Sequence, residues 1–107
     1  MNHIRSVLLS LVGLALAGGA LAAEYEVGQK NKAFTKDKLT IKVGETVSFP
    51  NQDPFFHNVY SLSPAKTFDL GSYPKGESKP VTFDQPGKVE VECAIHPQMH
   101  MVIEVVE

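Results

Sequence analysis

A chain of 107 residues with a formal net charge of −2 is long enough for one domain with a single modest core. Its 21% charged residues, 43% apolar residues and seven prolines are ordinary for a globular protein. No basic stripe or aromatic-interleaved run indicates nucleic acid, and the single cysteine excludes an internal disulfide. The partners are therefore expected to be other proteins.

The first 22 residues have the layout of a secretory signal peptide. Arg5 precedes an apolar run over residues 7–16, and small residues follow as far as Ala22. The run is shorter than the roughly 20 residues that span a bilayer, so we expect a cleaved signal rather than a retained anchor. Cleavage is expected after Ala22 or Ala23, which places the mature protein in the periplasm.

The mature part, residues 23–107, is expected to form one domain and to be a monomer. It keeps nine lysines against twelve acidic residues and is therefore mildly acidic. At about 85 residues it lies near the size at which stability becomes marginal without a disulfide cross-link or a bound metal. No amphipathic stretch indicates a membrane surface, so no membrane insertion is expected after cleavage.

Short alternating patterns separated by turn residues fill the first half of the mature chain, and no window holds a helical period. Residues 29–37 are mostly polar and are predicted to form a loop or an edge strand. Turn formers are dense over residues 50–54, so this loop is expected to deliver His57. Strands are predicted over residues 24–28, 39–43 and 47–49.

His57 begins another predicted strand, which ends at Leu62. Residues 63–78 contain two prolines and two glycines and are predicted to form a long irregular excursion that could include one helical turn. Cys93 ends an alternating run and should share the inward face with Val89 and Val91. Seven or eight short strands favour an all-β fold, a Greek-key β-sandwich of two sheets. The remaining strands are predicted over residues 81–83, 89–93 and 101–105.

Cys93, His96 and Met99 leave one short loop together, and His57 can add a second imidazole. A thiolate, two imidazoles and a thioether are soft-to-borderline donors that suit copper. A near-planar set of two imidazoles and one thiolate, with a weak axial thioether, is acceptable to both Cu(II) and Cu(I). The axial sulfur is open at this point, because Met101 could compete with Met99.

The segment from Cys93 to Met99, C-A-I-H-P-Q-M, resembles the C-x₂-H-x₂-M ligand loop of the amicyanin-like branch of the plastocyanin family of cupredoxins. H-N-V at His57 resembles the family's upstream ligand segment, and residues 39–49 resemble its first core strands. The similarity covers about residues 34–106. It implies an eight-stranded Greek-key sandwich with one copper ion in a type 1 site. The ligands carried over by this resemblance are His57, Cys93, His96 and Met99.

Two positions depart from the family pattern. Met101 lies at the longer spacing found in plastocyanin and pseudoazurin, although the H-P-x-M run favours Met99 and Met101 is in phase with core positions. Ala94 stands where relatives often carry a hydroxyl that pairs with the asparagine beside the upstream histidine. Asn58 is therefore expected to tie the two loops through backbone groups.

The resemblance also implies an exit for electrons, through the exposed ring edge of His96. Pro97, Pro54, Phe55 and Phe56 would form an apolar patch around it. The expected partners are redox proteins, a cytochrome, dehydrogenase or oxidase, docking near His96. His100 is expected to face solvent.

Three functions compete on this sequence. The leading interpretation is a blue copper protein that carries single electrons and is not an enzyme. A periplasmic copper-delivery or storage protein is the alternative, although such proteins favour exposed clusters of methionine and histidine. An enzyme with Cys93 as nucleophile and His96 as base lacks a third orienting group, and Cys93 is expected to face inward.

Overall fold

The structure is a computed structural model that describes residues 23–107, so the predicted signal peptide lies outside the described residues. These residues form ten strands and no helix, and hence no helical segment that could cross a membrane. Short alternating runs such as K-L-T-I-K favour strands because a period of two places apolar side chains on one face.

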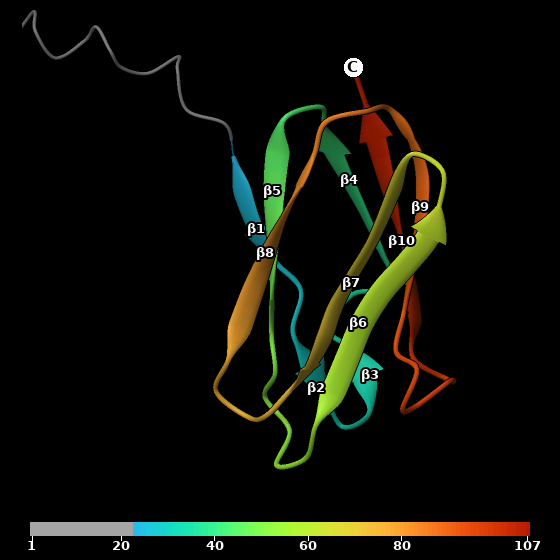
Figure 1. Cartoon of the computed structure of the whole chain (residues 1–107). Helices are drawn as coiled ribbons and strands as arrows, with labels where there is room; N and C mark the ends of the chain where they lie inside the picture. The colour runs from blue at the N-terminus through green and yellow to red at the C-terminus, as the bar shows by residue number, and fades with distance from the viewer. Residues whose placement is uncertain (1–22) are drawn as a thin grey trace, which may run out of the picture.

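Two sheets pack face to face, and a small hairpin lies at one end of them (Figure 1). The smaller sheet has the order β1-β5-β8 and consists of β1 (Glu24–Glu26), β5 (Glu45–Pro50) and β8 (Ser78–Phe83). The larger sheet has the order β4-β10-β9-β6-β7 and consists of β4 (Lys38–Lys42), β10 (His100–Val106), β9 (Gly87–Glu92), β6 (His57–Ser63) and β7 (Lys66–Tyr73). The hairpin consists of β2 (Gln29–Lys30) and β3 (Ala33–Phe34). The predicted all-β sandwich is confirmed.

The turn between β4 and β5 shows how the chain crosses from one sheet to the other. Gly44 has a φ of +95°, a conformation that favours glycine. Its N–H donates to the carbonyl of Phe83 in the smaller sheet, while the N–H of Val43 donates to the carbonyl of Val106 in the larger one. The turn is therefore bonded to both sheets, and such crossings are typical of Greek-key sandwiches.

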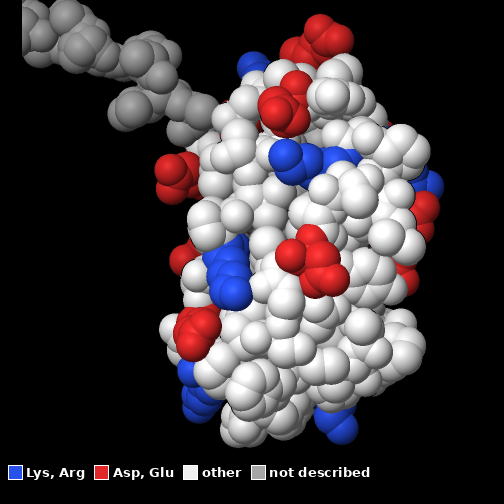
Figure 2. Space-filling view, in the orientation of Figure 1, with Lys and Arg blue, Asp and Glu red and all other residues white. Residues whose placement is uncertain are grey.

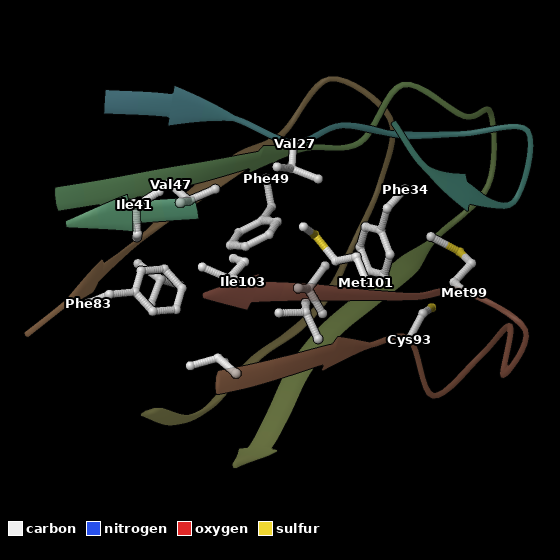
Figure 3. Packing of buried hydrophobic residues seen from close by; sticks show 14 of the residues in the cluster. Val27, Phe34, Ile41, Val47, Phe49, Phe83, Cys93, Met99, Met101 and Ile103 are labelled. Carbon is white, nitrogen blue, oxygen red and sulfur yellow. The ribbon is translucent and has the colours of Figure 1, made fainter. Parts of the chain in front are cut away.

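The inward faces of the two sheets form one core (Figure 3). The alternation predicted for the strand before the ligand loop is confirmed, because Val89, Val91 and Cys93 are all buried. The other buried apolar residues are Val27, Phe34, Ile41, Val47, Phe49, Val59, Tyr73, Val81, Phe83, Met99, Met101, Ile103 and Val105.

The prediction for residues 63–78 was wrong. This segment contains β7, which pairs with β6 in antiparallel register instead of wandering irregularly. Phe68 and Leu70 turn toward the core while Thr67 and Asp69 are exposed, which is the alternation of a strand. Gly71, with φ of +75°, lies at the register shift in the pairing of β7 with β6, and glycine often marks such a bulge.

The buried side chain of Gln29 is expected to lower the free energy of unfolding, and a substitution can test this. Gln29 is fully buried, and neither its amide oxygen nor its amide nitrogen has a hydrogen-bond partner within residues 23–107. A buried polar group left unpaired costs about 1–3 kcal/mol. Gln29→Met, which keeps a similar length, is expected to raise the free energy of unfolding by about 1 kcal/mol in urea titrations. A loss of stability would contradict this account.

Candidate metal centre

Three connecting segments gather at the end of the sandwich opposite the chain's C-terminus (Figure 1). They are the β5–β6 loop over residues 51–56, the β9–β10 loop over residues 93–99, and the β2–β3 turn at Asn31 and Lys32. The first loop leads into His57, and the second begins with Cys93 and contains His96.

His57, Cys93 and His96 come together across these loops, and one donor atom of each lies within 4.8 Å of the others. The Sγ of Cys93 is 3.7 Å from Nδ1 of His57 and 3.9 Å from Nδ1 of His96. The two Nδ1 atoms are 3.2 Å apart. His57 and Cys93 are buried, whereas His96 is partly exposed.

Asn51 shapes the loop that delivers His57. Its buried side-chain amide donates to the carbonyls of Phe55 and Tyr73, both at 2.9 Å, and its Oδ1 accepts the N–H of Asp53 at 2.8 Å. Tyr73 is itself fixed, because its hydroxyl donates to the carbonyl of Phe49 at 2.7 Å. Burial raises the pKa of Tyr73 to about 12, so this hydroxyl keeps its proton at neutral pH. The loop therefore has a defined shape despite its lack of regular structure.

Asp53 holds the far side of the His57 ring. Nε2 of His57 donates to Oδ2 of Asp53 at 2.7 Å in a fully buried contact. Burial opposes ionisation of Asp53, but the hydrogen bonds from His57, Lys32 and Asn31 outweigh it and lower the pKa of this carboxyl. With its proton on Nε2, His57 presents the lone pair of Nδ1 to Cys93 and His96.

Asn58 ties the two ligand loops together, as predicted. The N–H of Ala94 donates to Oδ1 of Asn58 at 3.2 Å, and the N–H of Asn58 donates to the Sγ of Cys93 at 3.4 Å. The partner on the other side of the Asn58 amide is Asp69, whose carboxylate accepts from Nδ2 at 2.9 Å. The backbone thus replaces the hydroxyl that Ala94 lacks.

Both methionines near the loop are buried, but they occupy different places. Met99 lies just before β10, and its N–H donates to the carbonyl of His96 at 2.9 Å. Its sulfur lies at the same end of the core as Cys93 (Figure 3). Met101 lies within β10 opposite Val91, and its sulfur points into the middle of the core.

The surface around His96 is apolar. Phe55 packs against the rings of both His57 and His96, with centroids 5.4 and 5.3 Å apart. Phe56 is 53% exposed and Ile95 is 46% exposed. Figure 2 shows few charged side chains at this end of the visible face. His100 is exposed, as predicted, and its Nε2 lies 3.1 Å from Oε1 of Glu90.

The electrostatics of the site keep His96 available as a ligand. Burial lowers the pKa of His96, and the neighbouring His57 and Lys32 lower it further. A neutral imidazole is the form that binds a metal. Two imidazole lone pairs and a thiol at these separations fit copper better than the oxygen-preferring ions Mg²⁺ and Ca²⁺.

A sandwich that brings one cysteine and two histidines together at its end defines a cupredoxin-type copper protein. Residues 21–106 match the family model for copper binding proteins of the plastocyanin/azurin family, and the chain belongs to this family. Copper is accordingly its cofactor.

Individual relatives agree with this assignment. The chain is 29% identical to methylamine utilization protein MauL of Methylorubrum extorquens, over 98% of this chain and 93% of MauL. Amicyanin from Paracoccus versutus superposes with a TM-score of 0.71 at 27% identity, covering 79% of this chain and 83% of amicyanin. The copper-containing nitrite reductase of Thermus scotoductus gives 0.75 at 30% identity, covering 86% of this chain but only 25% of the enzyme.

Asp53, Asp69 and Lys32, which support the site, were not predicted from the sequence, and Ile95 was not part of the predicted apolar patch. Asp53 was counted only as a turn former, although it lies four positions before His57. Ile95 could have been predicted from the sequence, because it is an apolar residue between two ligand candidates in a loop. Lys32 and Asp69 could not, since only the fold brings them to this end.

Proposed function

We propose that this protein carries single electrons between redox proteins, with copper held by His57, Cys93, His96 and Met99. The observation that carries the proposal is the convergence of His57, Cys93 and His96 from two loops to within 4.8 Å. Bound copper would supply a Cu(II)/Cu(I) couple in a type 1 site. Because hydrogen bonds of Asn51, Asp53 and Asn58 brace the loops, the ligands would need little rearrangement when the copper changes oxidation state.

Met99 would be the axial ligand. Its sulfur lies at the Cys93 end of the core, whereas Met101 fills the interior opposite Val91. A weak axial thioether completes the donor set that accepts both copper oxidation states.

The two competing functions find less support in the structure. Met99 and Met101 are buried at 1% and 0% exposure, so they do not form the exposed sulfur cluster that copper delivery or storage favours. Cys93 is 1% exposed, which hinders its use as a nucleophile on a substrate. An electron carrier needs neither its methionine sulfurs nor its cysteine thiol at the surface.

Electrons would enter and leave through the partly exposed edge of His96. The apolar patch, defined as Pro54, Phe55, Phe56, Ile95 and Pro97, lies on the two loops that lead to the ligands, and Phe55 packs on His96. It would offer a docking surface for a cytochrome, dehydrogenase or oxidase. An apolar surface desolvates readily and permits brief contacts. The protein would be exported to the periplasm by the signal peptide over residues 1–22 and would function there as a monomer.

The test is to load the purified mature protein with Cu(II). An intense blue colour, from thiolate-to-copper charge transfer, that bleaches reversibly on one-electron reduction is the expected result. A colourless Cu(II) protein in which Cys93 reacts freely with an alkylating reagent would refute the proposal.

Copper loading should also stabilise the fold, because the ligands join two distant loops. Free copper at about 100 times its dissociation constant adds about 2.7 kcal/mol to the free energy of unfolding. Thermal unfolding of the metal-free and Cu(I) forms measures the difference. Equal midpoints at saturating copper would contradict the ligand assignment.

Phe56→Asp is expected to slow electron self-exchange between two copies by about tenfold or more, equivalent to about 1.4 kcal/mol. Two copies that meet through the apolar patch would then face each other with like charges. NMR line broadening in mixtures of the oxidised and reduced forms measures the rate. Leu62→Asp is the matched control, since Leu62 is 75% exposed near the opposite end of β6. Equal rates in the two variants would place docking elsewhere.

A further inference from the structure

Asp53 accepts hydrogen bonds from two separate parts of the molecule. Its Oδ1 accepts the backbone N–H of Asn31 at 2.7 Å, and its Oδ2 accepts the N–H of Lys32 at 3.0 Å. Oδ2 also accepts Nε2–H of His57 at 2.7 Å. The side chain is 4–5% exposed, so water does not compete effectively for these bonds.

The carboxylate of Asp53 holds the β2–β3 turn. Asn31 and Lys32 have φ of +57° and +58°, in the left-handed region that side chains other than glycine rarely adopt. Two successive left-handed residues form the tight turn favoured in two-residue hairpins, and here both of their N–H groups point toward the same carboxylate. Asp53 supplies that anion from within the chain.

The same carboxylate fixes the His57 ring. Because Oδ2 can only accept, the hydrogen bond requires the proton of His57 to be on Nε2, which leaves the Nδ1 lone pair directed toward Cys93 and His96. Lys32 adds a second link, since its Nζ lies 5.7 Å from the centre of the Phe55 ring, and Phe55 packs on both imidazoles.

We propose that Asp53 is a positioning residue that fixes the tautomer of His57 and couples the β2–β3 hairpin to the metal centre. The ring orientation and the shape of the turn then depend on one carboxylate, so disturbing either one disturbs the other. The inference rests on the proposed function where it concerns copper, but the tautomer and the turn can be tested in protein prepared without metal.

The experiment compares Asp53→Asn and Asp53→Ala with wild type and with Asp84→Asn, an exposed carboxylate that serves as the matched control. Nitrogen-15 NMR of the His57 ring in the metal-free protein reports the tautomer. Hydrogen exchange reports protection of the Asn31 and Lys32 amides. Competition titrations with a Cu(I) chelator report affinity, and voltammetry of the copper-loaded protein reports the reduction potential.

Wild type and Asp84→Asn are expected to show His57 protonated on Nε2 and protected amides at Asn31 and Lys32. Both Asp53 variants should show a mixed tautomer, exchange at these two amides at least about tenfold faster, and Cu(I) binding about 10–100-fold weaker. Their reduction potential should rise, because a negative charge next to the site, which favours Cu(II), has been removed.

Asp53→Asn is nearly isosteric and keeps the test decisive if Asp53→Ala fails to fold. An unchanged His57 tautomer with copper affinity within twofold of wild type would overturn the proposal, even if the turn amides exchange faster, because Asp53 would then be only structural. If wild type itself fails to turn blue, the electron-carrier function fails, while the metal-free tautomer and exchange data still decide the role of Asp53.

Discussion

Cys93→Ser is expected to abolish the intense blue absorption of the Cu(II) protein while leaving the sandwich folded. The colour depends on charge transfer from a thiolate, and the hydroxyl of serine is a poor copper ligand at neutral pH. The fold should survive because serine is slightly smaller and its oxygen can still accept the N–H of Asn58. Visible absorption and circular dichroism of the variant check the two statements.

Ala94→Ser is the matched control, since it places a hydroxyl one residue further along the same loop and leaves the thiolate intact. It should keep the blue colour. The hydrogen bond from the Ala94 backbone to Asn58 does not involve the side chain and should persist. A Cys93→Ser protein that remains as intensely blue as wild type would show that Cys93 does not bind copper.

The strand pattern and the donor pattern could both be predicted from the sequence, and for the same reason. Inward-facing positions repeat every second residue, so Val89 and Val91 reveal the direction in which Cys93 points. The spacing from Cys93 to His96 then limits where the imidazole can reach. Local geometry is sufficient for these steps, and the structure places His57, Cys93 and His96 together.

The residues that brace the site depend on long-range contacts, which local patterns do not encode. Asp53 meets a turn more than twenty positions earlier, and Asn58 meets Ala94 from 36 positions away. The strand β7 was missed because Pro64, Gly71, Pro74 and Gly76 were taken as breakers of any long element. The register shift at which Gly71 lies depends on the pairing of β7 with β6, which is a property of the assembled fold.

Substitutions of Met99 and Met101 test which of the two sulfurs binds copper. Met99→Leu and Met101→Leu each remove a sulfur while nearly conserving volume, and each should cost less than about 1.5 kcal/mol of stability. Met99→Leu is expected to change the visible spectrum and shift the reduction potential of the copper protein, because a type 1 site is tuned by its axial ligand. Met101→Leu should leave both unchanged.

Met101→Ala separates packing from ligation. Met101 is fully buried opposite Val91, so its truncation leaves a cavity and should lower the free energy of unfolding by about 2–5 kcal/mol, measured by urea titration of the metal-free protein. The spectrum of the folded copper form should resemble that of wild type, since the sulfur points into the core rather than toward Cys93. If Met101→Leu alters the spectrum and Met99→Leu does not, the axial assignment is reversed, and the loop binds copper at the longer spacing.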